Sequence, residues 1–361
     1  MGQLAQAVGA PCPTLVLEAA GLPATDAALR PLLTEVRGRL AAAGAGHVLK
    51  IALLAPSPHP LFDLDYRFVQ CLPGGPDEFD FLGSCGHSIL ASVLVAARRG
   101  LLPGLAPGDR IRLRVLNNGD HVVCEVDASA RRDAAFTLHF LQQPDTPLRR
   151  LLLTGLPVDR LPVDTGVQDA SLVSLGNPYV FVDARDLGLR TREELFHAGD
   201  EIFERMGRIR TAATDLLRWP SGSVFPKIAA VGVYEPGLLS ARAISVPRWH
   251  PTLALTGITC LAAAACLEGT LPELLQREAA GGAGPPGPAA QQGTAGRSVR
   301  IDTPGGAARA AVHLADTPGG PVLQWVSVGR KHVRLESDPL DLTFRDISVA
   351  EEAEPCLPLT V

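Results

Sequence analysis

The stretch GSCGHSILASVLVAARRG, residues 83–100, decides the fold. Ser84 can cap the N-terminus of a helix here, and the closing Arg-Arg-Gly supplies a basic last turn and a stop. Between these ends the sequence is almost entirely apolar, so the helix needs other elements to cover it. We expect a core helix that begins at Cys85 or Gly86 and ends near Arg99.

Segments with strand periodicity surround this helix in the sequence. Strands are predicted at 48–55, 66–71, 110–116, 122–127 and 136–141, and an amphipathic helix at 25–43. The turn Asn117-Asn118-Gly119-Asp120 indicates a hairpin, because Asn-Gly tolerates positive φ. The first 155 residues therefore predict antiparallel strands wrapped around one apolar helix.

The second half repeats this plan. Strands are predicted at 178–184, 226–233, 241–246, 299–302, 307–314 and 323–328, with mostly helix over 191–217 and a second apolar helix over 252–267. Residues 155–164 would cross between the halves, and the Gly/Pro/Ala-rich segment 279–297 would form a flexible insertion. We predict an α+β chain with two lobes, 1–155 and 156–361, each with antiparallel strands around a central helix. The site would lie in the cleft between the lobes.

Composition excludes several classes of function. A chain of 361 residues with 46% hydrophobic and 20% charged residues is typical of a folded protein with two domains. Its net charge of -5 argues against nucleic acid as a partner, and no segment reaches the roughly 20 apolar residues of a membrane span. The seven cysteines and nine histidines lack metal-binding spacing. We therefore expect no disulfide framework, no metal and a cytoplasmic location.

Cys85 is the strongest candidate for chemistry. A cysteine in the first turn of a helix meets unpaired amide hydrogens and the positive end of the dipole, which favour the thiolate. The same amides can hold a substrate carboxylate or an enolate oxygen. A small buried residue in a Gly-rich turn is the alternative interpretation. The turn fits neither a nucleophile elbow nor a dinucleotide-binding loop.

Two lysines lie in apolar strands. Lys50 would sit at an exposed strand edge or point into the cleft, where desolvation would make it a base or a proton relay. Lys227 poses the same question in the second half. His250, just before the second apolar helix, is a ligand contact or a structural histidine, and Thr256-Gly257 permits close helix packing or binds substrate.

Six segments in order resemble the PrpF family of methylaconitate and methylitaconate isomerases, within the diaminopimelate-epimerase-like superfamily. Residues 82–87 match the S-G-N-C-G-N segment, 48–54 the T-S-K-T-V-I-L strand and 65–70 the D-Y-x-F-x-Q strand. Residues 175–184 are similar to N-A-G-x-P-x-x-F-V-x-A, 226–229 to P-K-V-A and 250–270 to the His-led helix that ends in P-G-T. Their order and spacing carry the resemblance over nearly the whole chain.

The resemblance implies a two-lobed epimerase fold, an active site between the lobes and no cofactor. It places Cys85 and Lys50 at the proton-transfer positions. The expected substrate-binding residues are Ser84, Gly86, His87, His250, Lys227, Thr256 and Arg330. A small molecule is the expected partner, with a homodimer as an additional option.

The chain differs from the family in residues that are expected to contact the substrate. The family opens with an R-G-G-T-S-K-G turn that contacts substrate, and Leu17–Gly21 stands there as LEAAG. His87 replaces an asparagine, and Val333 replaces the second arginine of the R-x-x-R pattern that Arg330 begins. We expect a larger and less acidic substrate than a tricarboxylate, from specialised metabolism.

The leading hypothesis is an isomerase that moves a C=C bond by a 1,3-proton shift beside an activating carbonyl or carboxylate. An epimerase, or a cyclase initiated by deprotonation, would use the same pair of residues. A binding protein that has lost catalysis is the third hypothesis, motivated by the missing N-terminal motif.

Overall fold

The computed structural model describes residues 2–144, 146–164, 166–220, 222–245, 248–281 and 296–340. The predicted insertion at 279–297 lies outside them except for its ends, where Ala279 closes a helix and Arg297 opens a strand. Cys356 also lies outside. Within the described residues, no helix is both long and apolar enough to cross a membrane.

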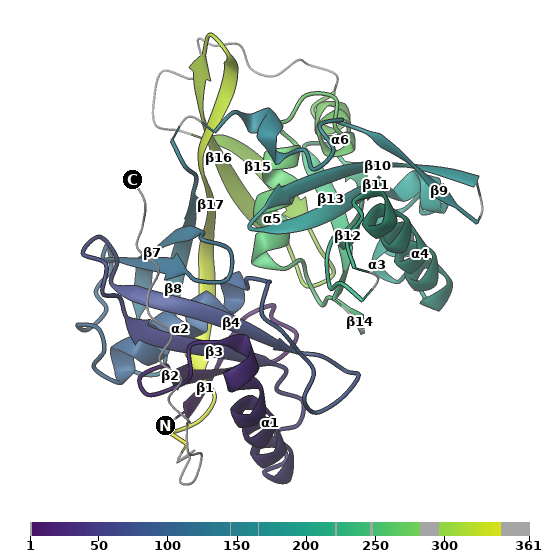
Figure 1. Cartoon of the computed structure of the whole chain (residues 1–361). Helices are drawn as coiled ribbons and strands as arrows, with labels where there is room; N and C mark the ends of the chain where they lie inside the picture. Colours follow the sequence, from purple (N-terminus) through teal and green to yellow (C-terminus); the bar gives the residue numbers. More distant parts are fainter. Residues whose placement is uncertain are drawn as a thin grey trace, which may run out of the picture.

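The elements of the first half alternate strands with two long helices (Figure 1). They are β1 (Gly2–Ala7), β2 (Thr14–Glu18), α1 (Asp26–Ala42), β3 (Lys50–Pro56), β4 (Leu64–Cys71), β5 (Phe79–Asp80), α2 (Gly86–Arg98), β6 (Arg110–Val115), β7 (His121–Ser129), β8 (Asp133–Leu141) and the 3₁₀ helix η1 (Leu148–Leu151).

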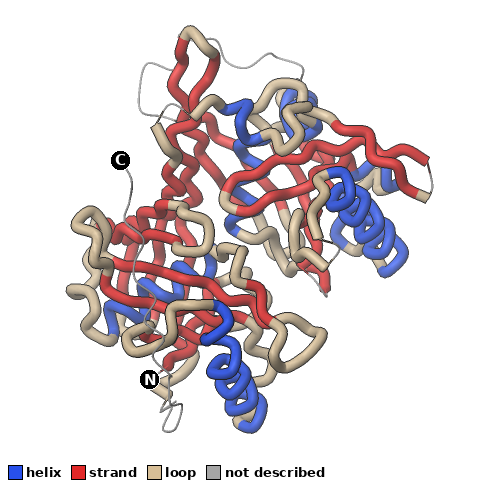
Figure 2. The backbone as a smooth tube through the Cα atoms, in the orientation of Figure 1, coloured by secondary structure: helices blue, strands red, loops and turns tan. Residues whose placement is uncertain are grey.

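The second half follows with a similar order. Its elements are β9 (Asp159–Val163), β10 (Gly166–Leu175), β11 (Asn177–Asp183), the 3₁₀ helix η2 (Ala184–Leu187), α3 (Arg192–Phe196), α4 (Asp200–Leu216), β12 (Lys227–Glu235), β13 (Leu238–Ser245), β14 (Arg248–Trp249), α5 (Leu255–Ala264), α6 (Leu271–Ala279), β15 (Arg297–Asp302), β16 (Ala308–Thr317) and β17 (Gly320–Leu335). Strands dominate both halves, as Figure 2 shows.

A closed ring of strands surrounds α2 in the first half. Each strand pairs with the next in the order β1, β2, β3, β4, β6, β7, β8 and β17, and β17 pairs back onto β1. Every residue of α2 from Gly86 to Ala96 is buried. A helix with no polar side is stable in water only inside such a cover, which explains why α2 lies at the centre of the ring.

The second half repeats the order of pairings. In the first half β1–β2 is antiparallel, β2–β3 parallel, β3–β4 antiparallel and β4–β6 parallel. In the second half β10–β11, β11–β12, β12–β13 and β13–β15 follow the same sequence of directions. α5 occupies the place of α2 and is buried along its whole length.

Several expectations need correction. The strands are not all antiparallel, because α1, α2, α4 and α5 each lie within a crossover, and a crossover joins parallel strands. Strands β1, β2 and β10 were not predicted, and β9 lies within the stretch 155–164 that was expected only to connect. The helix predicted over 252–267 begins at Leu255, because the chain first forms β14 and a turn around Pro251.

The two halves share a core and a strand. One apolar cluster contains residues of both α2 and α5. The long strand β17 pairs with β16 over its first part and with β8 and β1 over its last part. Figure 1 shows β17, in yellow, running from the green half into the blue and purple half. The division into domains at residue 155 stays a prediction.

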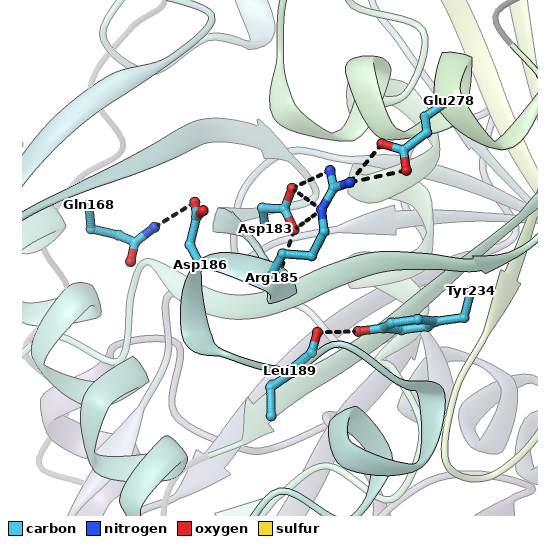
Figure 3. Close-up of polar contacts among 7 residues, drawn as sticks. All are labelled: Gln168, Asp183, Arg185, Asp186, Leu189, Tyr234 and Glu278. Carbon is cyan, nitrogen blue, oxygen red and sulfur yellow. Dashed lines mark hydrogen bonds and ion pairs between the residues drawn. The ribbon is translucent and has the colours of Figure 1, made fainter.

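A polar cluster on the second half fixes the turn after β11 (Figure 3). The Arg185 guanidinium donates to both oxygens of Asp183 and to Glu278 of α6. The carboxylate of Asp183 holds the pKa of Arg185 above its usual range. Nearby, Gln168 donates to Asp186 and Tyr234 donates to the Leu189 carbonyl. The contact between Arg185 and Glu278 joins α6 to the turn after β11.

Candidate active site

Cys85 and Lys50 lie in direct contact. Cys85 is the N-cap of α2, with extended backbone at φ -139° and ψ 106°. Lys50 is the first residue of β3, and its Nζ lies 3.5 Å from Cys85 Sγ. Both residues are buried, with 5% of Lys50 and 8% of Cys85 exposed. The two candidate proton-transfer residues therefore form one buried pair at a helix N-terminus.

Neighbouring strands hold this pair in place. Thr14 of β2 lies opposite Lys50 in the parallel register, and its hydroxyl is 2.8 Å from the hydroxyl of Ser88 in the first turn of α2. Tyr66 of β4 donates to the carbonyl of Cys85 at 3.3 Å. The sequence singled out neither Thr14, Tyr66 nor Ser88, because their roles come from register between distant segments.

The charges around the thiol favour its ionised form. Burial by itself raises the pKa of Cys85, but the ammonium of Lys50, the polar groups of Ser88 and the charge of Lys227 outweigh burial. The pKa of this thiol therefore lies below its ordinary value, and thiolate is the reactive species. The predicted cap was wrong: Cys85 itself is the N-cap, and the buried hydroxyl of Ser84 has no partner among the described residues.

The second half contributes Lys227 to this site. Lys227 is the first residue of β12, and its Nζ lies 5.8 Å from the centre of the Phe225 ring. Phe225 in turn packs against Gly83, where an added Cβ would stand 3.0 Å from its Cζ. Burial lowers the pKa of Lys227, while the nearby Cys85 raises it and Lys50 lowers it further.

A buried asparagine joins the two helix starts. Asn177 of β11 accepts from the Ser84 amide at 3.0 Å and donates to the Ser84 carbonyl at 2.8 Å. It also donates to the hydroxyl of Thr256 in α5 at 3.0 Å. The starts of α2 and α5 are so close that an added Cβ at Gly86 would lie 2.7 Å from that of Leu255. Sequence reasoning placed Thr256 in the site but did not single out Asn177, which positions both helices.

A cavity of about 200 Å³ opens at the first turn of α2, where His87 lines it. It is lined by Val8, Gly9, His87, Thr252, Ile258, Thr303, Gly305, Gly306, Ala307, Ala308, Arg330, Lys331 and His332. His87 is buried, and its Nδ1 has no hydrogen-bond partner among the described residues. The lining includes two basic side chains and no carboxylate.

Arg330 and Lys331 are these two basic side chains. Arg330 lies in β17 with a φ of +52°, a conformation that costs a non-glycine residue free energy and that clusters at functional sites. It was predicted to bind substrate, and the structure places it on the same cavity as His87. Lys331 was not predicted. Its pKa is lowered by burial.

The expected position of the opening turn was wrong. Leu17 is buried beneath α1, and β2 carries Leu17–Gly21 away from its Lys50 end. The residues that line the cavity instead come from the β1–β2 turn, where the carbonyl of Gly9 accepts from the Thr252 hydroxyl at 2.9 Å. This turn, VGAPCP at 8–13, contains no basic residue.

His87 and His250 form a stacked pair, with ring centres 6.2 Å apart. His250 accepts from the Thr252 amide through Nδ1 at 3.1 Å. Burial and the charge of Lys50 hold the pKa of both rings well below the usual value. Both rings are therefore neutral at pH 7.

This pair makes stability sensitive to acid. Below about pH 6.5 the unfolded chain protonates both histidines while the folded chain does not, so stability is lost as the pH falls. The loss is about 1.4 kcal/mol per pH unit for each ring. Urea unfolding at pH 7.5 and 5.5 should show a smaller loss for His87→Gln than for the wild-type chain. The exposed His47→Gln is the matched control, and an equal loss in all three proteins would contradict this assignment.

Within the described ranges, no three His, Cys, Asp or Glu side chains are grouped to hold a metal ion. The absence of a metal and of a cofactor stays a prediction. The roles assigned to individual site residues are also predictions.

Comparison with known proteins identifies the family. The family model described as PrpF protein matches residues 38–284. The 3-methylitaconate isomerase of Eubacterium barkeri is 24% identical over 268 residues, which cover 63% of this chain and 70% of that protein. This similarity confirms the predicted enzyme class, an isomerase.

Solved structures agree on the fold. A methylitaconate-delta-isomerase matches with a TM-score of 0.64 and 21% identity, over 92% of both chains. A hydroxyproline epimerase from Agrobacterium vitis matches with a TM-score of 0.60 and 15% identity, over 94% of this chain and 93% of that one. The fold is thus shared by isomerases and epimerases. The PrpF family model matches more than half of this chain, so the chain belongs to the PrpF family.

Proposed function

We propose that the protein is a cofactor-independent isomerase that moves a C=C bond by a 1,3-proton shift. The observation that carries this proposal is the contact between Lys50 and Cys85 at the N-terminus of α2. A thiolate beside an ammonium at a helix start combines a base, an acid and oriented amide donors in one buried place. Such a site suits the removal of a weakly acidic C–H proton.

The reaction is balanced without an oxidant or reductant. The Cys85 thiolate takes an allylic proton from the carbon next to the double bond, and the electron pair of that C–H bond becomes part of a dienolate. The amide hydrogens at the start of α2 stabilise the oxygen on which negative charge develops. A proton then returns at the other end of the allylic system, and the double bond has moved by one position.

The cavity restricts the substrate. About 200 Å³ accommodates a small molecule, and Arg330 and Lys331 favour an anion there. The β1–β2 turn lacks the basic and hydroxyl residues of the R-G-G-T-S-K-G motif, so a tricarboxylate would lack partners. We infer an unsaturated carbonyl compound or carboxylate with fewer anionic groups, of the kind found in specialised metabolism.

Proton exchange with solvent tests this function. The enzyme should introduce deuterium from D₂O into a panel of unsaturated acids comprising vinylacetate, itaconate and 3-methylitaconate, together with their amides. The expected result is label at the new sp³ carbon together with a shifted double bond in NMR spectra. Exchange with inversion at one carbon and no shift would favour an epimerase, and a ring product would favour a cyclase. Absence of exchange across the panel would contradict the proposal and favour a binding protein.

One feature favours the isomerase over a symmetric epimerase. Ala254 is the N-cap of α5, the place that corresponds to Cys85 in α2. Racemisation through two facing thiols needs a proton-carrying side chain at both helix starts. This chain has such a side chain, Cys85, at the start of α2 and an alanine at the start of α5.

A further inference from the structure

The chain uses lysine at three positions only. Of its 33 basic residues, Lys50, Lys227 and Lys331 are the lysines and the rest are arginines. All three lie around the candidate site. Lys50 contacts Cys85, Lys331 lines the cavity with His87, and the charges of all three lower the pKa of His87. Arginine occurs throughout the molecule, on the cavity at Arg330 and buried at Arg242 as well as on the surface, whereas the three lysines all lie near Cys85 or His87.

This distribution has a chemical meaning. An arginine guanidinium stays protonated in proteins, whereas a lysine can release its proton when it is desolvated. Arginine can form an ion pair or carry a surface charge as well as lysine can, and this chain uses arginine at most of its basic positions. A group that must give up and regain a proton has to be lysine.

The internal repeat gives Lys227 the same position in the second half that Lys50 has in the first half. Lys50 is the first residue of β3, which runs parallel to β2. Lys227 is the first residue of β12, which runs parallel to β11. β3 and β12 hold the same place in the two series of pairings. The two amines thus enter the site from corresponding strands of opposite halves.

The second half has no other group for this task at the corresponding places. Ala254 replaces the thiol at the start of α5. The carboxylate of Asp80, which lies near Lys227, accepts from the Gly83 amide at 3.1 Å. Lys227 Nζ itself has no hydrogen-bond acceptor or ion-pair partner among the described residues, and its nearest recorded contact is the Phe225 ring. Its proton is therefore not held by an acceptor among these residues.

We propose that Lys227 is the second acid–base group of the reaction and delivers the proton to the far end of the allylic system. This inference rests on the proposed function. Cys85 gains the proton of the first C–H bond, and the Lys227 ammonium gives one to the second carbon and becomes a neutral amine. Transfer of a proton from the Cys85 thiol to this amine, through Lys50 or solvent, restores the starting state.

The first test needs no substrate. Labelling with lysine carrying ¹³C at Cε gives three signals, which Lys227→Arg and Lys331→Arg assign by their absence. The Lys227 signal should titrate below the roughly 10.4 of an ordinary lysine. Its midpoint should fall further in Cys85→Ala, because the thiolate that favours the ammonium is gone. A Lys227 signal that titrates at the ordinary value and ignores Cys85→Ala would overturn the proposal.

The second test separates proton removal from proton delivery, with 3-methylitaconate in D₂O as the first probe. Lys227→Met should still exchange the first proton with solvent, because Cys85 and Lys50 remain. It should lose double-bond transfer by about 100-fold or more, the size of a general acid effect. Lys227→Arg keeps the charge and should lose transfer as well.

Other outcomes decide against the proposal. Retention of transfer in Lys227→Arg would show that charge suffices, and equal loss of exchange and transfer in Lys227→Met would assign Lys227 to binding. Arg160→Met removes an exposed cation of β9 that does not line the cavity, so it is the control, and its ratio of transfer to exchange should equal that of the wild-type chain. If the wild-type chain exchanges no member of the panel, the proposed function fails, while the NMR titration still decides whether Lys227 faces Cys85.

Discussion

Replacing Cys85 with alanine should lower kcat by about 10²–10⁴-fold, the usual contribution of a general acid–base group. The side chain fills little space and packs at a helix start, so the fold should survive, as circular dichroism and the thermal midpoint would show. Cys85→Ser should keep a trace of activity, because a hydroxyl carries a proton but ionises far less readily than a thiol.

Cys124→Ala is the matched control. Cys124 is also buried, but it lies in β7 and burial alone raises the pKa of its thiol. Its replacement should leave kcat unchanged. Near-normal turnover of the best substrate of the panel by Cys85→Ala would rule out the thiol as the base and would direct attention to Lys50, Lys227 and His250.

Replacing Lys50 with methionine should have an effect of similar size on kcat, with a second signature on the thiol. The ammonium of Lys50 is the largest influence that opposes burial at Cys85, so its loss should raise the pKa of the thiol. At any pH below the pKa of the thiol, each unit by which this pKa rises lowers the thiolate fraction about tenfold. The rate of alkylation by iodoacetamide, measured against pH with the other accessible thiols accounted for, reports this change.

The arginine variant separates the two roles of Lys50. Lys50→Arg keeps a positive charge near the thiol and should preserve much of the fast alkylation, while a group that cannot release its proton should not restore turnover. Alkylation that is equally fast with lysine, methionine and arginine at position 50 would contradict the electrostatic pairing.

Local patterns predicted the parts of the fold that depend on neighbours in sequence. The buried helix after Gly83, the amphipathic helix after Thr25 and the hairpin at Asn117–Asp120 all follow from short-range patterning. The β1 strand escaped notice because its side chains are mostly small or polar, and β2 because it is only five residues long. Because these two strands were missed, the turn that was expected to contact substrate was wrongly placed at Leu17–Gly21.

The candidate site shows the same division. Cys85 and Lys50 stand in segments with a recognisable local pattern. Asn177, Thr14 and Lys331 reach the site only through strand register and through the path of β17, which brings residues more than 200 positions apart together. Pairing at such distances is set by how whole faces of a sheet pack, and a local pattern does not report it.

The path of β17 bears on how the protein is made. The ring around α2 closes only when Lys331–Arg334 pair with β8 and Val333–Leu335 pair with β1. While the ribosome is still elongating the chain, both flanking strands present open edges, which are prone to pair with other chains. The N-terminal half is synthesised first but completed last, so the Cys85 thiol gains its full enclosure only after β17 has left the ribosome.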